Sequence, residues 1–235
     1  MTGTLAPLFP FVMMAAFICG VWLSQHYKSE LALLPSQKVW IGMCAFSGAI
    51  LAAKLPFLVP GLPGFVGASG LLVSGKTILF GMVGGYAGVE FAKSVIGTRL
   101  KTGDYFVVPV ATSIGIGRLG CFCGGCCHGV PTTLPWGVHF AHVDDQLRHP
   151  TQIYEAAFHL AMAAVCAWLY RQGKLRHQLI KFYFLTYFAF RFLSEFVRPE
   201  ARLAAGLTVY QWTCLVLIPV FVWLWIRDAK ACYTN

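Results

Sequence analysis

The segment from Gly115 to Gly129 offers more chemistry than any other part of this sequence. It contains six glycines, one arginine, four cysteines and a histidine within fifteen residues. Glycine lets the backbone approach a ligand closely and exposes N–H groups that can hold an anion. Arg118 adds a planar guanidinium that matches the geometry of phosphate. We therefore expect the helix to break in this segment and to form a site for a phospholipid headgroup.

Four of the nine cysteines crowd into the stretch Cys121–Cys127. Three interpretations are open. The first is a disulfide, for instance between Cys123 and Cys126, on an oxidising outer face. The second is a metal site with His128, completed by a second group of ligands from His139, His142 or His149. The third is a reactive thiolate beside Arg118. We assign no metal ligands, and the remaining cysteines are interpreted as packing residues.

A second set of charged residues follows a helical spacing. Arg191, Glu195 and Arg198 stand at i, i+4 and i+7, so they share one face of a helix. A charged residue at the centre of a membrane span costs about 2.5–3.5 kcal/mol on insertion scales, so such residues indicate function. The alternative is a structural Arg191–Glu195 ion pair, with Arg198 reaching toward the headgroup layer.

Histidine titrates near neutral pH, which makes His149 a candidate general base in the loop before the fifth apolar stretch. The alternative is that Arg148 and His149 only cap the following helix. His159 lies alone in an apolar stretch and is predicted to be a hydrogen-bonded packing residue. Glu90 and Lys93, three residues apart, are predicted to form a structural ion pair.

The elements that must position these residues are membrane helices. Hydrophobic residues make up 57% of the 235-residue chain and charged residues 11%, against about 25% in ordinary soluble domains. Too few charged residues exist to cover the surface of a soluble bundle. We predict an all-α, polytopic membrane bundle in a single domain, residues 1–235, with an outward-facing loop at 120–150. The Gly- and Pro-rich segment Pro60–Gly75 is either a surface loop or a re-entrant segment. The seven predicted transmembrane stretches are Leu5–Ser24, Val39–Val59, Thr77–Ile96, Tyr105–Gly120, Gln152–Tyr170, Gln178–Val197 and Thr208–Ile226.

The orientation follows from the 18 lysines and arginines, which outnumber the 9 acidic residues. No lysine or arginine precedes Lys28, so the first stretch is interpreted as a permanent helix rather than a signal peptide. Cations are enriched in cytoplasmic loops, and most of them fall inside if the N-terminus is outside and the C-terminus inside. Those assigned to the inner side are Lys28, Lys38, Lys93, Arg99, Lys101, Arg171, Lys174, Arg176, Lys181, Arg227 and Lys230.

Several motifs in a fixed order resemble the prolipoprotein diacylglyceryl transferase family. They are Gly117-Arg-Leu-Gly-Cys-Phe with Gly125 and Gly129, Leu134-Pro-Trp, Arg148-His-Pro-Thr-Gln-Ile-Tyr-Glu, Arg191-x-x-x-Glu-Phe-x-Arg-Pro and Gly206-Leu-Thr-x-x-Gln-Trp. The resemblance implies transfer of a diacylglyceryl group from phosphatidylglycerol to a lipobox cysteine thiol. The reaction releases glycerol phosphate at the outer face of the bacterial cytoplasmic (inner) membrane. Seven spans with the N-terminus outside also agree with the family.

The resemblance also assigns residues. Arg118 corresponds to the family's headgroup-binding arginine and Gly129 to its closing glycine. Gly120 and Gly125 belong to the same headgroup segment, and Arg191, Glu195 and Arg198 match the family's late Arg/Glu/Arg face. The chain departs from the family at Cys121, where the family has Asn, and at Cys126, where it has Glu. The family's His-Gly-Gly signature has no histidine here, its best match being Leu79-Phe80-Gly81.

We therefore predict a phospholipid-dependent transferase with an altered site. Arg118 and Arg198 would hold the phosphate, and His149 or His128 would deprotonate the acceptor in place of the missing histidine. Glu195, Cys121 and Cys126 complete the catalytic candidates, the cysteines as a covalent relay or redox-sensitive group. The expected partners are phosphatidylglycerol, a lipoprotein precursor or another thiol acceptor, and membrane lipids, with no cofactor and no nucleic acid. The alternatives are a membrane redox or metal-binding protein that uses the Cys121–Cys127 cluster, and a non-catalytic lipid-binding subunit.

Overall fold

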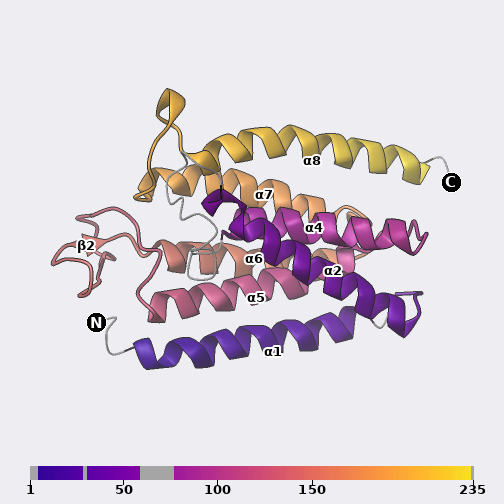
Figure 1. Ribbon diagram of the computed structural model, residues 1–235, viewed down its shortest axis with the longest axis horizontal. Helices are drawn as coiled ribbons and strands as arrows, with labels where there is room; N and C mark the ends of the chain where they lie inside the picture. The colour runs from indigo at the N-terminus through magenta and orange to yellow at the C-terminus, as the bar shows by residue number, and fades with distance from the viewer. Residues whose placement is uncertain (1–4, 29–30, 59–76, 234–235) are drawn as a thin grey trace. The chain divides into compact units, whose positions relative to one another are not determined.

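The computed structural model describes residues 5–28, 31–58 and 77–233. Within these ranges the chain forms seven long helices, and the prediction of a helical membrane protein is confirmed (Figure 1). The predicted segment Pro60–Gly75 lies outside the described residues. The long helices are α1 (Phe9–Lys28), α2 (Pro35–Lys54), α4 (Ile78–Val95), α5 (Gly103–Cys123), α6 (Thr151–Arg171), α7 (Leu179–Ser194) and α8 (Val209–Tyr233). Short 3-10 turns are η2 (Ala6–Leu8), η3 (Leu55–Phe57), η4 (Glu195–Val197) and η5 (Ala204–Gly206).

Five segments of the described chain are long and apolar enough to cross a membrane. They are Ala6–Lys28, Pro35–Phe57, Gly103–Cys123, Thr151–Arg171 and Val209–Lys230. Helices α4 and α7, of 18 and 16 residues, do not meet that measure. The total of seven spans and the orientation of the termini therefore stay predictions.

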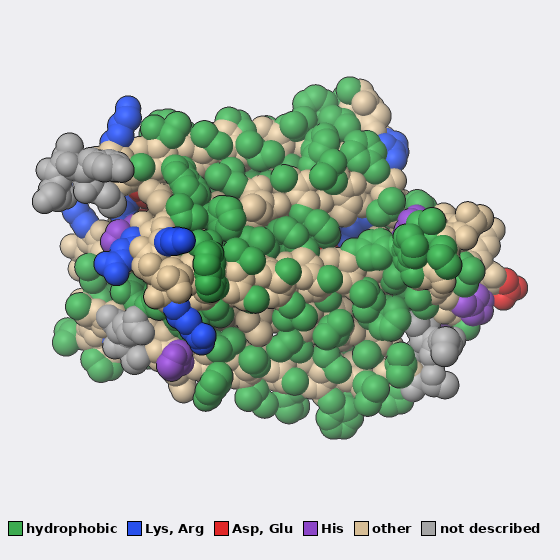
Figure 2. Space-filling model, turned by 180° about the vertical axis from the view of Figure 1, so that it is seen from behind, with side chains coloured by type: hydrophobic (Ala, Val, Ile, Leu, Met, Phe, Trp, Pro, Cys, Tyr) green, Lys and Arg blue, Asp and Glu red, His purple; other side chains and the backbone are tan. Residues whose placement is uncertain are grey.

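Large apolar side chains point outward from the spanning helices. Phe11 in α1 and Leu51 in α2 are 69% and 70% exposed, and Trp223 in α8 is 59% exposed. Figure 2 shows hydrophobic side chains over much of the helix surface on the face in view. Such side chains are suited to the hydrocarbon of a bilayer rather than to water.

The chain divides into two compact units. The larger contains α1, α5, α6, α7, the loop between α5 and α6, and α8 from Gln211 onward. The smaller contains α2, α4 and the segment Ala201–Tyr210. The prediction of a single domain over residues 1–235 stays a prediction.

In the smaller unit, glycines bring α2 and α4 into backbone contact. A Cβ atom on Gly48 would lie 2.4 Å from the Gly84 carbonyl oxygen, and one on Gly88 would lie 2.2 Å from the Cys44 carbonyl oxygen. Small residues at four-residue spacing allow this kind of close helix packing in membranes. Near the end of α4, Lys93 Nζ lies 2.7 Å from Glu90 Oε1, as the predicted ion pair requires.

In the larger unit, one end is held together by polar contacts between helix ends. Asp104 at the start of α5 accepts hydrogen bonds from the backbone N–H groups of His177, just before α7, and Leu179, the first residue of α7. Lys181 of α7 pairs with Asp228 of α8 at 2.9 Å. We call this the basic end, because it also carries Lys28, Arg171, Lys174, Arg176, Arg227 and Lys230.

The opposite end of the larger unit carries the loop between α5 and α6, and we call it the site end (Figure 1). This loop contains one short antiparallel hairpin of β1 (Val138–His139) and β2 (Leu147–Arg148), a small departure from the predicted all-α fold. The Val130 N–H donates to the Val197 carbonyl oxygen at 2.9 Å, which ties the loop to the turn after α7.

The predicted break in the helix within the Gly-rich segment is wrong for its first half. Helix α5 continues through Gly115 and Gly120 to Cys123. Both glycines lie where neighbouring helices press against α5, because a Cβ on Gly115 would lie 2.7 Å from Leu160 Cγ and one on Gly120 would lie 2.9 Å from Met13 Sδ. Close packing therefore offsets their low helix propensity. The chain leaves the helix only at Gly125, whose φ of +70° favours glycine.

Candidate active site

Three helical segments of the larger unit bring charged residues together around one buried carboxylate. Arg118 Nη2 of α5 lies 2.6 Å from Glu155 Oε2 of α6. Arg198 Nη2, from the residue after η4, donates to the same oxygen at 2.8 Å. The other carboxylate oxygen of Glu155 accepts a hydrogen bond from the Tyr187 hydroxyl of α7 at 2.8 Å. All four side chains are buried.

The cluster carries more positive than negative charge. Next to the Arg118–Glu155–Arg198 group, Arg191 Nη2 pairs with Glu195 Oε2 at 2.8 Å. Three guanidinium groups therefore face two carboxylates, which leaves one net positive charge. The Nε atoms of Arg118 and Arg198 are buried and have no hydrogen-bond partner within the described part of the chain. Buried donors without partners are costly, so the arrangement favours an additional anion.

The residues after α5 are fastened to the first turn of α6. The Thr151 hydroxyl donates to the Cys127 carbonyl oxygen at 2.6 Å, and the Gln152 amide donates to the Cys126 carbonyl oxygen. Thr151 and Gln152 precede Glu155 by one turn of the same helix. Helix α6 therefore holds both the backbone of Cys126 and Cys127 and the Glu155 carboxylate.

Three of the clustered cysteines converge, and they are not the pair considered for a disulfide. The Sγ atoms of Cys121, Cys126 and Cys127 all lie within 4.8 Å of one another, whereas Cys123 is outside the group. All eight cysteines from Cys19 to Cys214 are free thiols. Hydrogen bonds among the three thiols lower the pKa of Cys127, with Arg118 and Arg198 adding positive charge nearby, and raise the pKa of Cys126.

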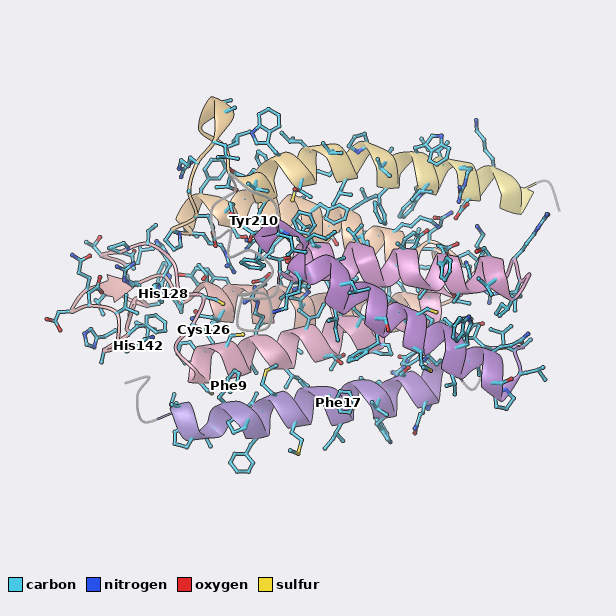
Figure 3. The ribbon with its side chains drawn as sticks, viewed as in Figure 1. Phe9, Phe17, Cys126, His128, His142 and Tyr210 are labelled. Atoms are coloured by element: carbon cyan, nitrogen blue, oxygen red, sulfur yellow. The ribbon has the colours of Figure 1, made fainter. Side chains whose placement is uncertain are left out.

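The predicted histidines do not join the charged cluster, and Figure 3 shows His128 and His142 at the site end. His149 Nδ1 lies 3.2 Å from the Tyr154 hydroxyl, and His128 Nδ1 lies 3.3 Å from the Gly129 carbonyl oxygen. His142 packs against Gly125, where an added Cβ would lie 2.3 Å from His142 Cε1. Among the described residues, the group of three sulfur atoms includes no histidine. The roles of His149 and His128 as general bases stay predictions.

The remaining candidates from the sequence have clear positions. Gly129 is in close contact with the chain just before Arg198, because an added Cβ would lie 2.5 Å from the Val197 carbonyl oxygen. The contacts of Arg148 are structural and stabilise the hairpin. It pairs with Asp144 and donates to the Gly129 carbonyl oxygen at 3.2 Å. This pairing lowers the pKa of Asp144. The Gly-rich segment thus contributes packing and loop geometry around Arg118.

Sequence reasoning missed the centre of the cluster. Glu155 was part of the Arg148–Glu155 motif, yet it was not assigned to the site. Its position as an acidic residue one turn into an apolar helix, with no cation on the same face, could have identified it. Tyr187 carried no such signal, because tyrosine is common in membrane helices. His159, predicted to be a packing residue, lies buried with its Nδ1 2.8 Å from the Tyr183 hydroxyl.

Comparison with known proteins identifies the family. The family model for prolipoprotein diacylglyceryl transferase matches residues 7–227 of the 235. The chain belongs to the prolipoprotein diacylglyceryl transferase family. The resemblance noted in the motifs is thereby confirmed, and the match covers the Arg118, Glu155 and Arg198 cluster as well as the smaller unit.

Curated relatives share the name phosphatidylglycerol–prolipoprotein diacylglyceryl transferase. One from Polynucleobacter necessarius is 34% identical over 183 residues, which cover 73% of this chain and 70% of the relative. One from Clostridium tetani is 32% identical over 163 residues, or 66% of each chain. One from Legionella pneumophila is 27% identical over 227 residues, or 90% of this chain and 86% of the relative. These relatives are enzymes by name.

Proposed function

We propose that this chain transfers a diacylglyceryl group from phosphatidylglycerol to a cysteine thiol of a lipoprotein precursor. The acceptor sulfur would attack the glycerol carbon that carries the phosphate, forming a C–S bond as the C–O bond breaks. Glycerol phosphate would leave with the electron pair of that bond, and the thiol proton would pass to a base. The names of the relatives supply the donor and the acceptor.

One observation carries the proposal: Arg118 and Arg198 converge from different segments on a single oxygen of Glu155. Glu155 orients both guanidinium groups but neutralises only one of them. Each arginine keeps a buried Nε donor without a partner among the described residues. Such donors, held in place before the reaction, suit a phosphate and can offset the charge that develops on the departing glycerol phosphate.

Neighbouring residues support this arrangement by fixing Arg198. The backbone N–H of Arg198 donates to the Glu195 carbonyl oxygen at 3.2 Å, and the Glu195 side chain is held by Arg191. On the other side, Gly129 allows the loop to pass against Val197. We assign Arg191, Glu195 and Gly129 as positioning residues for this reason.

The base that accepts the thiol proton belongs to the same end of the larger unit. His149 is the better candidate, because it is half-buried and lies six residues before Glu155 on the segment that leads into α6. Its hydrogen bond with Tyr154 orients the ring. His128 is the second candidate, and its ring packs at a tilt against Phe140 with ring centroids 5.3 Å apart.

The charge distribution of the larger unit favours an outward-facing site. The basic end carries seven lysines and arginines, of which Lys181 and Arg227 both pair with Asp228. Near the site end, the arginines of the cluster and Arg148 all have acidic partners. Lysines and arginines are enriched on the cytoplasmic side of a membrane, so the site end would face outward. The start of α1 lies at the site end and the end of α8 at the basic end (Figure 1), which agrees with the N-terminus outside and the C-terminus inside.

The test is release of headgroup-labelled glycerol phosphate from phosphatidylglycerol by the full chain in membranes, with and without a lipobox peptide. We expect release that requires the peptide and is lost in Arg118→Ala and Arg198→Ala. Lys174→Ala, which removes an exposed cation at the basic end, is the matched control. Absence of release by the folded wild-type protein would contradict the proposal. Release that ignores the peptide would contradict the proposed acceptor.

A further inference from the structure

The three converging cysteines form a group to which the proposed transfer, as written above, assigns no step. We propose that Cys121, Cys126 and Cys127 bind one thiophilic d10 metal ion, Zn(II) or Cu(I), through three thiolate sulfur atoms. Cys121 lies in the last turn of α5, and the other two follow the turn at Gly124 and Gly125. The proposal is independent of the transferase activity.

The distances suit a metal–thiolate centre. A zinc–sulfur bond is about 2.3 Å, so three sulfur atoms around one ion lie roughly 4 Å apart. The Sγ atoms of Cys121, Cys126 and Cys127 already lie within 4.8 Å of one another. Side-chain rotations that move each sulfur atom by less than about an ångström would complete the site. Soft thiolate ligands select Zn(II) and Cu(I) over Mg²⁺ or Ca²⁺.

The backbone holds the ligands in this arrangement without a metal. The Cys126 N–H donates to the Cys121 carbonyl oxygen at 3.2 Å, which closes the turn between two of the ligands. The carbonyl groups of Cys126 and Cys127 are fastened to buried Gln152 and Thr151 of α6. A loop held in this way loses little further freedom when the metal binds.

The surrounding charge favours an anionic metal centre. Three thiolates with Zn(II) carry a charge of −1, and with Cu(I) a charge of −2. Cys127 lies within electrostatic reach of Arg118 and Arg198, and the arginine–glutamate cluster has one positive charge in excess. This excess would offset part of the negative charge of the metal centre.

A metal accounts for the arrangement better than a disulfide. A disulfide between any two of the three sulfur atoms would leave the third without a role. Cys126 and Cys127 are exposed, so an ion can reach the site from solvent. Three thiolates complete the trigonal coordination of Cu(I). They leave one coordination position open on a tetrahedral Zn(II) ion.

The experiment is metal binding by the full chain, purified in detergent under reducing, oxygen-free conditions. Zn²⁺ and Cu⁺ are titrated separately against a chromogenic chelator, and Co²⁺ is used as a spectroscopic substitute for zinc. We expect one ion per chain, with the near-ultraviolet charge-transfer absorption of metal–thiolate bonds. Cys121→Ser, Cys126→Ser and Cys127→Ser should each weaken binding at least about tenfold, since loss of even an outer-shell partner costs that much.

Cys123→Ser is the matched control, because Cys123 lies in the same segment but outside the group of three. It should retain full binding. Equal loss in Cys123→Ser, or unchanged binding in the triple Ser variant, would overturn the proposal. Peptide mass spectrometry that finds two of the three joined as a disulfide under these conditions would also overturn it. Transferase activity is measured separately, so failure of either proposal is recognised on its own.

Discussion

Arg118 Nη2 lies 2.6 Å from Glu155 Oε2, and both side chains are buried within the larger helical unit. The pair joins the end of α5 to the beginning of α6. Because Arg198 binds the same oxygen, the carboxylate organises two cationic groups at once. The structure therefore adds Glu155 to the candidate site, beside the arginines that the sequence motifs emphasise.

Replacement of Glu155 by Gln should destabilise the protein and abolish transfer. The change leaves Arg118 and Arg198 buried without their shared counter-charge, and removal of one partner of a buried ion pair costs about 3–5 kcal/mol. Thermal unfolding in detergent and the glycerol phosphate assay measure the two effects. Asp145→Asn, at a fully exposed carboxylate, is the control and should change neither. A stable Glu155→Gln protein with normal activity would contradict the assigned role.

Replacement of Arg198 by Lys should reduce turnover while leaving the fold intact. Lysine keeps the positive charge and can still pair with Glu155, but it lacks the planar fork and the free Nε donor. Loss of one preorganised donor to a developing anion reduces kcat by roughly 10²–10³-fold. The measurement is kcat and KM at fixed protein stability. Arg171→Lys, at the exposed end of α6, should match the wild type.

Replacement of Gly129 by Ala should displace Arg198 without removing any charge. The new Cβ would lie 2.5 Å from the Val197 carbonyl oxygen, so the turn after α7 must move. We expect lower activity and a loss of about 1–3 kcal/mol in stability, as for other overpacked positions. Gly117→Ala is the control, because a Cβ there meets nothing within 4 Å. Equal effects of the two variants would show that the contact with Val197 is not the cause.

The hairpin should loosen at acidic pH through Asp144. Arg148 holds the pKa of Asp144 below its ordinary value of 3.8. Because the pKa is lowered by the ion pair, the pair stabilises the closed hairpin above about pH 3.8. This stabilisation is lost as the pH falls through the pKa of the paired Asp144 carboxylate. Hydrogen exchange of residues 131–149 between pH 7 and pH 3 measures the opening. In Asp144→Asn the exchange should already be raised at pH 7 and should lose this pH dependence.

Much of the architecture followed from local sequence. Each of the seven apolar stretches overlaps a long helix, because about twenty apolar residues favour a hydrogen-bonded helix wherever water is excluded. The Arg191–Glu195 pair also followed from sequence, since a four-residue spacing places two side chains on the same helix face. The ordered motifs were enough to indicate the family.

The path of α5 depended on contacts that local sequence does not contain. Helix propensity predicts a break at a run of glycines, but it contains no information about the neighbouring helices. Leu160 and Met13 occupy the space that side chains at Gly115 and Gly120 would need, so the missing side chains strengthen the packing. For the same reason, no pattern in the sequence indicated which three cysteines converge.

The sequence by itself determined the helices, the chemical types of the site residues and the family. The tertiary structure alone decided that Arg118, Glu155 and Arg198, up to 80 residues apart in the chain, share one carboxylate oxygen. Spacing along one helix fixes only neighbours within one or two turns. Partners on different helices are set by how the helices pack, and that packing minimises the cost of burying charge across the whole bundle.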